Sequence, residues 1–528
     1  MSTPNANPPQ PTISLANMTT DQKAGQLMMI GFDGTTVDVE LRRMITDYHI
    51  GGVILFARNV QSPEQVARLT NELQTIALES GHPGLFIAVD QEGGRVARLT
   101  EKTGFTEFPS AMAIGATGDP ENAYRMATAM AAEMRAVGIN VDFAPDLDVN
   151  NNPSNPVIGI RSFSSDPARV AEYGIAFAQG LQENGVLAIG KHFPGHGDTG
   201  IDSHVDLPRI PYERAHLNQV ELFPFKAAIQ ADFAGIMSAH VTFPAIDPTP
   251  GLAATLSRPV LTGLLRDELG YNGLIVTDSL EMGALAANGY PPPVGAPLAL
   301  AAGADLLLFN RDHTMHKKAF TNLVQTFKGG KVSQEQLDAS VRRILEAKAK
   351  FGILNPRLVA DPAKAGESTA TAEHHTLALE FARKAITLLK DDASLLPLKS
   401  GEPLLVIGTP AANGLGNLLG AKTLEVENDP NASAITAALN LVPNGCKVIV
   451  TTTDANLYAG QVKLVTELLV QNPKVIIVSV LTPYDISVLP IAPTVLACYG
   501  SNQPALQAIV DVLTGKSEAV GVLPVTLP

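Results

Sequence analysis

The sequence contains no tryptophan and only two cysteines among its 528 residues. Cys446 and Cys498 each lie in or beside an apolar run, which argues against a disulfide framework or a zinc site. We therefore expect both thiols to be buried and inert. Tryptophan is a common stacking platform for long polysaccharides, so its absence argues against a polymer-binding groove.

Positive charge is also scarce. The chain has 38 lysines and arginines against 52 aspartates and glutamates, a net charge of −14, and no basic patch is visible along it. Nucleic acid and anionic membrane surfaces are therefore poor candidate partners. A small neutral ligand fits this composition better.

Long apolar runs are missing as well. No run approaches the roughly 20 residues that span a bilayer, so we expect no transmembrane segment. Residues 1–11 are polar and proline-rich, without the basic start and apolar core of a signal peptide. We expect a cytoplasmic protein, and export of a trimmed precursor stays an open alternative.

Short apolar runs do recur, with helical patterns between them. Alternation of this kind, with eight candidate strands over about 300 residues, predicts an α/β fold with an N-terminal (β/α)8 barrel of the TIM type. The candidate strands are Gln26–Phe32, Gly52–Phe56, Leu85–Asp90, Asn140–Pro145, Leu187–His192, Gly235–His240, Leu274–Asp278 and Asp305–Asn310.

The remainder of the chain predicts a second domain. A charged helix over Ser333–Lys350, with Gly352 as its C-terminal cap, closes the barrel domain, which we place at residues 1–352. Residues 353–371 have a linker composition. Residues 372–528 predict an open parallel α/β sandwich, with a helix over 372–389 and strands at 404–408, 447–452, 474–481 and 494–499.

Polar residues follow the barrel strands, at the end where barrels of this type place their chemistry. They are Asp90, Asp146, Lys191, His192, His240, Asp278 and Asn310. The densest group is the loop from Lys191 to His204, which holds three of the 11 histidines of the chain together with glycine, proline and two aspartates. We therefore predict a functional site in this loop.

Several roles are open for these residues. Asp278 can act as a nucleophile or base, or it can cap a following helix. Asp202 and His204 are two apart and can form a proton-transfer pair, or they can be solvated loop residues. A metal site built from His192, His196, Asp198, Asp202 and His204 is disfavoured, because Lys191 would repel a cation and no H-E-x-x-H pattern occurs.

Two further groups indicate a sugar ligand. Residues 89–96 end the third candidate strand with two acids, two glycines and an arginine, and carboxylates at such a rim commonly accept hydrogen bonds from vicinal hydroxyls. Arg161 can donate to hydroxyls or to an acid, or it can fix its loop through a salt bridge.

Taken together, these motifs resemble glycoside hydrolase family 3, and within it the bacterial β-N-acetylglucosaminidases of the NagZ type. The resemblance spans the whole chain in its two-domain form. Its most specific part is Lys191-His192-Phe193-Pro194-Gly195-His196-Gly197 with Asp202-Ser203-His204, and residues 89–95, 161–163 and 277–282 support it.

The resemblance implies a retaining exo-β-N-acetylglucosaminidase that needs no metal or other cofactor. Asp278 would be the nucleophile, and His204 the general acid/base, held by Asp202. Asp90, Arg161, Lys191 and His192 would bind the terminal sugar. The expected substrate is a small saccharide that carries N-acetylglucosamine, from muropeptides or chitooligosaccharides. A phosphorylase and an inactive sugar-binding barrel are the alternatives.

Overall fold

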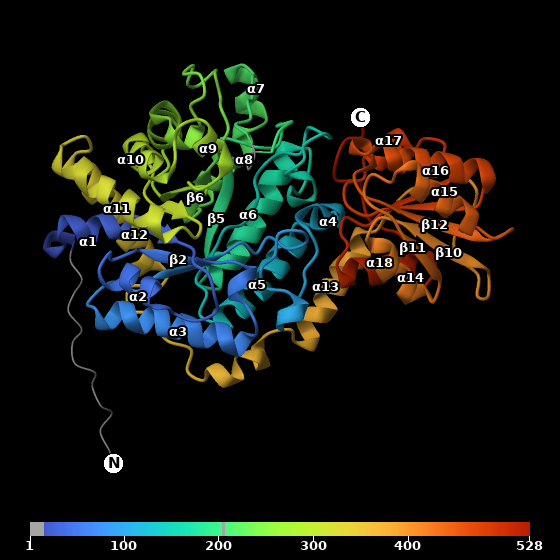
Figure 1. Cartoon of the computed structure of the whole chain (residues 1–528), viewed down its shortest axis with the longest axis horizontal. Helices are drawn as coiled ribbons and strands as arrows, with labels where there is room; N and C mark the ends of the chain where they lie inside the picture. The colour runs from blue at the N-terminus through green and yellow to red at the C-terminus, as the bar shows by residue number, and fades with distance from the viewer. Residues whose placement is uncertain (1–14, 203–205) are drawn as a thin grey trace, which may run out of the picture.

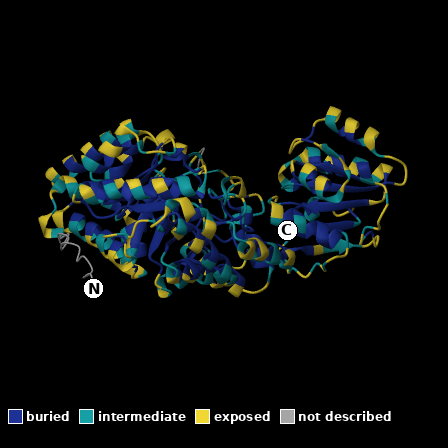
Figure 2. Ribbon diagram, turned by 90° about the horizontal axis from the view of Figure 1, so that it is seen from below, coloured by how far each residue is buried: buried dark blue, intermediate teal, exposed yellow. Residues whose placement is uncertain are grey.

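The computed structural model describes residues 15–202 and 206–528, which form two α/β domains side by side (Figure 1). The first domain is drawn from blue to yellow and the second in orange and red. Buried residues fill the strands in the middle of each domain, and exposed residues lie on the outer helices (Figure 2). Each domain therefore has its own apolar core.

Eight parallel strands form the predicted barrel. They are neighbours in chain order, β8 lies beside β1, and the isolated bridge between Val276 and Leu306 joins β7 to β8. All eight predicted ranges overlap an observed strand, so the barrel prediction is confirmed. The strands are β1 (Met28–Ile30), β2 (Gly52–Leu55), β3 (Phe86–Val89), β4 (Val141–Asp142), β5 (Leu187–Phe193), β6 (Gly235–Ser238), β7 (Leu274–Thr277) and β8 (Leu307–Phe309).

Helices cover the outside of the barrel because their apolar faces pack on the strands. The predicted closing helix is α12, where the Ser333 hydroxyl accepts a hydrogen bond from the Gln336 amide and Gly352 has a φ of +70° just beyond the end. The helices are α1 (Thr20–Gln26), α2 (Val39–Thr46), α3 (Pro63–Glu79), α4 (Ala111–Ala116), α5 (Glu121–Ala136), α6 (Pro167–Glu183), α7 (Arg214–Gln219), α8 (Leu222–Gln230), a π-helix (Pro259–Glu268), α9 (Gly283–Ala287), α10 (Pro292–Ala302), α11 (His313–Lys328) and α12 (Gln334–Lys350).

The second domain is an open sheet of six strands in the order β11-β10-β12-β13-β14-β9. The predicted strands correspond to β10 (Leu404–Gly408), β12 (Lys447–Thr452), β13 (Val475–Ser479) and β14 (Thr494–Ala497). Helices α14 (Ala411–Leu419), α15 (Ala432–Leu441), α16 (Ala459–Gln471), α17 (Asp485–Val488) and α18 (Gln503–Leu513) connect or follow these strands.

This domain differs from the prediction in detail. The helix expected over 372–389 ends earlier, as α13 (Ala372–Ala385), and β9 (Thr387–Asp391) pairs antiparallel with β14, so the sheet is mixed instead of fully parallel. The second edge strand, β11 (Lys422–Glu425), has no counterpart in the prediction. Strands β9 and β11 lie at the two edges of the sheet, where a strand is buried on fewer sides and shows a weaker apolar pattern.

An apolar cluster joins the two domains. Met112 of α4 and Ile160 of the 3₁₀ helix Gly159–Arg161, in the connections that follow β3 and β4, pack with Tyr484, Tyr499 and Val525 of the second domain. These barrel loops lie at the carboxyl ends of the strands, so the second domain sits beside the barrel mouth. The expected domain limits at 352 and 371 stay a prediction.

Several short 3₁₀ helices complete the described residues. They are Leu15–Asn17, Ala57–Asn59, Glu101–Thr103, Gly159–Arg161, Ala254–Leu256, Pro362–Ser368 and Ala455–Leu457. Within the two described stretches, none of the helices combines the length and the apolar character needed to cross a bilayer.

Candidate active site

A pocket of about 480 Å³ opens at the carboxyl ends of the barrel strands. Six of the seven predicted site residues line it: Asp90, Arg161, Lys191, His192, Asp202 and Asp278. They come from the end of β3, the loop after β4, strand β5, the loop after β5 and the end of β7. The seventh, His204, lies outside the described residues. Residues far apart in the sequence therefore converge on one cavity of ligand size.

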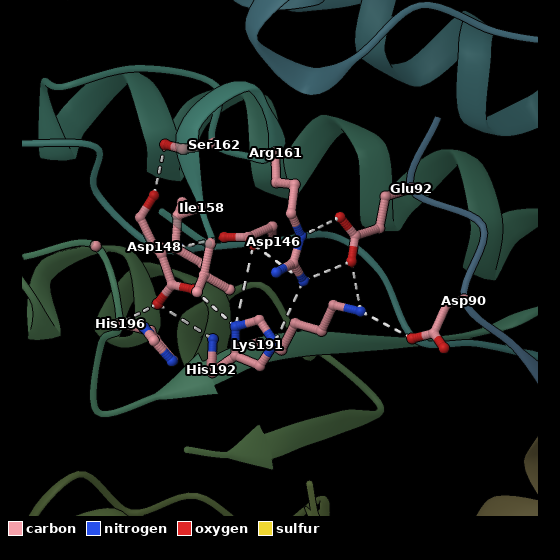
Figure 3. A network of polar contacts seen from close by, with 12 residues as sticks. Asp90, Glu92, Asp146, Asp148, Ile158, Arg161, Ser162, Lys191, His192 and His196 are labelled. Carbon is pink, nitrogen blue, oxygen red and sulfur yellow. Dashed lines mark hydrogen bonds and ion pairs between the residues drawn. The ribbon is translucent and has the colours of Figure 1, made fainter. Parts of the chain in front are cut away.

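A buried carboxylate, Glu92, is the centre of the polar network in this pocket (Figure 3). The guanidinium of Arg161 donates to it through Nε and Nη2, both at 2.8 Å, and Nζ of Lys191 lies 2.6 Å from its Oε1. Burial alone would raise the pKa of Glu92, but the two cations outweigh burial and hold this pKa well below its usual range. Glu92 is thus ionised and fixes both cations in place.

Asp90 is the more accessible acid of the network. Its side chain is 17% exposed, against 3% for Glu92, while Nζ of Lys191 donates to its Oδ1 at 3.0 Å and Arg98 donates to its Oδ2 at 3.4 Å. A carboxylate has room for about four hydrogen bonds, so Asp90 keeps accepting capacity on the pocket side. This arrangement suits a ligand that offers hydroxyl groups.

His192 is held as a neutral imidazole. Its Nδ1 lies 2.7 Å from Oδ2 of Asp148, and its Nε2 lies 3.4 Å from the guanidinium of Arg161. Burial, with a contribution from the Arg161 charge, lowers the pKa of His192 to about 4. Burial also raises the pKa of Asp148 to about 6. The ring is therefore oriented by Asp148 and faces the pocket uncharged.

One group of side chains among the described residues converges as metal ligands do, namely Asp146, Asp148 and His192. It shares only His192 with the metal site considered from the sequence. The group fits a metal ion poorly, because the Arg161 guanidinium already lies 3.6 Å from Oδ2 of Asp146 and the ring of His192 is hydrogen-bonded to Asp148. These acids serve as anchors for the cations and the imidazole of the network.

The first half of the loop after β5 is fixed by packing. The side-chain amide of Asn155 donates to the carbonyl oxygens of His196 and Gly197 at 2.9 and 2.7 Å. A Cβ atom on Gly197 would lie 1.8 Å from the carbonyl oxygen of Val149, so this close approach requires glycine. This packing holds residues 194–199 while Asp202 lines the pocket.

Asp278 follows β7 directly and is partly exposed in the pocket. Helix α9 begins later, at Gly283, with Met282 as its N-cap, so Asp278 does not cap that helix. The Ser279 amide donates to Oδ1 of Asp278 at 2.7 Å. His240, which does not line the pocket, has its Nε2 2.9 Å from the Ser279 carbonyl oxygen and thus supports the same segment from behind.

Behind the loop, Glu221 is a buried acid that packs on Gly195. A Cβ atom on Gly195 would meet the Glu221 Cβ at 2.7 Å, and Nε2 of His216 lies 3.6 Å from Oε1 of Glu221. Burial, strengthened by the charge of Asp198 in the loop, raises the pKa of Glu221 to about 7. The folded protein therefore binds a proton here that the unfolded chain has lost above its ordinary pKa.

This titration predicts a pH-dependent effect of Glu221→Gln. Because the pKa of Glu221 is raised in the folded protein, wild type loses part of its stability as the pH rises from the ordinary value of 4.5 through about 7. The glutamine variant lacks this loss. The melting temperature of the variant minus that of wild type should therefore increase from pH 5 to pH 8, as measured by thermal unfolding. The same difference at both pH values would contradict the shift.

Two residues of the network were not singled out from the sequence. Glu92 belongs to the acid cluster after β3, where the two acids could not be ranked without knowing which one is buried. Asp148 lies after β4 beside Asp146, and nothing in its spacing indicated that it would meet His192. Arg161 forms the predicted salt bridge to an acid and also lines the pocket.

Comparison with known families matches both domains of the chain. The model described as the glycosyl hydrolase family 3 N-terminal domain matches residues 19–347, and that of the family 3 C-terminal domain matches residues 386–528. The chain belongs to glycosyl hydrolase family 3. The family resemblance of the sequence motifs is thus confirmed.

Some similar proteins match nearly the whole chain, and others match about half of it. A β-hexosaminidase A of Pseudoalteromonas piscicida is 35% identical and covers 98% of both chains. A β-hexosaminidase of Alkalilimnicola ehrlichii is 42% identical over 287 residues, which are 79% of its own length but 53% of this chain. A solved family 3 β-N-acetylglucosaminidase of Paenibacillus sp. FPU-7 is 40% identical, with a TM-score of 0.91 over 97% of this chain and 99% of its own.

Proposed function

We propose that this protein is a retaining exo-β-N-acetylglucosaminidase that releases terminal β-linked N-acetylglucosamine from small saccharides. The observation that carries the proposal is the likeness, over nearly the full length of both chains, to the β-N-acetylglucosaminidase of Paenibacillus sp. FPU-7. The pocket at the barrel mouth supports it, because its cations and acids supply hydrogen-bond donors and acceptors for the hydroxyl and amide groups of a neutral sugar.

In this proposal Asp90, Arg161, Lys191 and His192 bind the terminal sugar. Asp90 accepts hydrogen bonds from hydroxyl groups, since its carboxylate is the exposed acid of the network. Lys191 and Arg161 donate to the remaining hydroxyl and amide oxygens, and Nε2 of the neutral His192 ring accepts from a hydroxyl group. Salt bridges to Glu92 and the hydrogen bond to Asp148 hold these groups before the sugar arrives, which lowers the entropy cost of binding.

The proposed reaction has two steps. A carboxylate oxygen of Asp278 attacks the anomeric carbon while His204, held by Asp202, gives a proton to the leaving oxygen, so that the glycosidic bond breaks and a glycosyl ester forms. His204 then takes a proton from water, which attacks the same carbon and releases Asp278. Two inversions leave the β configuration unchanged.

A histidine in place of the usual second carboxylate has a physical rationale. Retaining glycosidases generally pair two carboxyl groups, and a second anion beside Asp278 would disturb the charge of the nucleophile. An imidazole is neutral when it is not protonated and titrates near neutral pH, so it can serve as acid and then as base.

The natural substrates in this proposal are chitooligosaccharide or muropeptide fragments, processed in the cytoplasm during carbohydrate or cell wall recycling. The missing tryptophan and the ligand-sized pocket at the barrel mouth favour a short substrate that is cut from its end. No metal or other cofactor takes part in the two steps.

A substrate panel tests the proposal. Wild-type protein should release nitrophenol from 4-nitrophenyl N-acetyl-β-glucosaminide at least about a hundredfold faster than from the β-glucoside, because an amide-binding site rejects an analogue that leaves its polar groups unpaired. Hydrolysis of the glucoside alone would overturn the proposal, and no release from either would favour a sugar-binding barrel. A sugar 1-phosphate formed only in phosphate buffer would favour a phosphorylase instead.

A further inference from the structure

Glu281 is an acid of the active-site pocket to which the proposed reaction gives no role. It follows Asp278, the proposed nucleophile, on the segment between β7 and α9, and its side chain belongs to the pocket lining. This side chain is 15% exposed. Three roles are open to such an acid: contact with the sugar, stabilisation of the fold, or control of the position of Asp278.

The carboxylate of Glu281 is bound by the chain that follows β8. Its Oε1 accepts from the Asn310 amide at 3.0 Å and lies 2.7 Å from Nε2 of His316. Its Oε2 accepts from the Arg311 and Asp312 amides at 3.1 and 3.4 Å. The side chain thus joins the segment after β7 to the residues that lead from β8 into α11.

These bonds use the hydrogen-bonding capacity of Glu281 within the protein. A carboxylate accepts about four hydrogen bonds, so little capacity is left for a sugar. Burial alone would raise the pKa of Glu281, but the hydrogen bonds from His316 and from backbone amides outweigh burial and lower this pKa. Because an ionised carboxylate only accepts, Nε2 of His316 donates to it.

The segment that Glu281 anchors is the one that carries Asp278. The Leu280 amide donates to the Leu308 carbonyl at 2.9 Å, so a backbone bond holds the middle of this segment on β8. Glu281 adds a second tie beside Met282, the residue before α9. Asp278 therefore lies on a short turn that is held between the end of β7 and the end of β8.

His316 completes the anchor from the interior of the protein. It lies on α11, is fully buried and does not line the pocket. Its ring packs near that of Phe309 of β8, with the ring centroids 5.4 Å apart. His316 is therefore placed to affect the pocket through Glu281 and not through contact with a ligand.

We propose that Glu281 is a positioning residue for the nucleophile, which holds the turn of Asp278 against the end of β8 without binding the sugar. The inference rests on the proposed function. Attack on the anomeric carbon needs the carboxylate oxygen at about 3–3.5 Å and correctly aligned, and a misplacement of about 1 Å can slow a reaction about a hundredfold. An anchor of four hydrogen bonds keeps such a misplacement small.

The first test is Glu281→Gln. Glutamine keeps the shape of the side chain but has one acceptor oxygen, so its NH₂ group meets groups that also donate. We expect kcat/KM for 4-nitrophenyl N-acetyl-β-glucosaminide to fall about tenfold to a hundredfold, because this ratio includes the attack by Asp278. The inhibition constant of N-acetylglucosamine should stay within about twofold, since the proposed sugar ligands are unchanged.

His316 gives a second readout, which also tests the proposal if Glu281→Gln does not fold. His316→Leu removes a donor to Glu281 but no atom of the pocket lining, and it should lower kcat/KM with the same unchanged inhibition constant. His316→Gln restores an Nε2 donor and should recover most of the loss. The double variant should be little slower than Glu281→Gln alone, because both changes act through one contact.

Asp391→Asn is the matched control. The carboxylate of Asp391 also fixes a loop, since it accepts from the Leu395 amide at 3.1 Å and from the Thr494 hydroxyl at 2.7 Å, but it lies on β9 of the C-terminal domain. We expect a lower melting temperature, as for Glu281→Gln, while kcat/KM stays within about twofold of wild type.

The outcomes separate the claims. A fall in kcat/KM for Glu281→Gln at an unchanged inhibition constant supports the positioning role. An inhibition constant that rises as much as kcat/KM falls would show that Glu281 binds the sugar, and a lower melting temperature alone would show that it only stabilises the fold. Either result overturns the inference and leaves the proposed function intact. A wild type that does not hydrolyse the aryl substrate would overturn the proposed function and this inference with it.

Discussion

Asp278→Asn should lower kcat for 4-nitrophenyl N-acetyl-β-glucosaminide at least about a thousandfold, because loss of a covalent nucleophile removes the first step of the reaction. The amide keeps the shape of the side chain but is a far weaker nucleophile than a carboxylate. Asp278 is partly exposed, so the melting temperature should change little. Steady-state rates and thermal unfolding measure the two quantities.

The control for this variant is Asp267→Asn, an exposed aspartate of the π-helix before β7. It makes the same chemical change outside the pocket lining and should keep full activity. A fall of less than about tenfold in kcat for Asp278→Asn would contradict its role as the nucleophile.

Glu92→Gln should have the largest effect on stability. The substitution leaves Arg161 and Lys191 buried without the carboxylate that accepts from both, and breaking a buried ion pair in this way costs about 3–5 kcal/mol of unfolding free energy. We expect a lower denaturant midpoint and also a raised KM, because both cations are proposed sugar ligands. In wild type the stabilisation by Glu92 is present above its ordinary pKa of 4.5 and is lost as the pH falls below it.

Glu72→Gln is the matched control. Glu72 also pairs with an arginine, Arg42, at 3.1 Å, but the two side chains are 44% and 51% exposed. Exposed pairs contribute about 0–1 kcal/mol. Equal losses of stability in Glu92→Gln and Glu72→Gln would mean that the buried network does not have the energetic role given to it here.

Much of the fold was predictable because parallel strands inside a barrel are buried on both faces and stand out as short apolar runs. Strand β5, Leu187–Phe193, begins at the predicted residue, and Gly352 ends the last barrel helix as expected. The edge strands β9 and β11 were missed, since Thr387–Asp391 continues the apolar pattern of the helix before it and Lys422–Glu425 has no fully buried residue.

The site was predictable as a set of strand-end residues and less so as a network. Strand topology brings Asp90, Lys191 and Asp278 to one rim of the barrel, and their positions at strand ends predict that they converge there. Packing between distant loops decides that Glu92 is more buried than Asp90 and that Asp148, not Asp146, lies within hydrogen-bond distance of His192. The sequence alone therefore could not rank Glu92 and Asp148 above their neighbours. The pocket between the barrel and the C-terminal domain depends on how the two domains dock, which no local sequence pattern predicts.

The central claim, that Asp278 forms a glycosyl ester with N-acetylglucosamine, is tested most directly by trapping that ester. A fluorinated N-acetylglucosaminyl fluoride slows release of the intermediate, and mass spectrometry of the digested protein locates the label. The account predicts one added sugar on the peptide that contains Asp278. A label on another residue, or no label while the same protein still hydrolyses 4-nitrophenyl N-acetyl-β-glucosaminide, would contradict it.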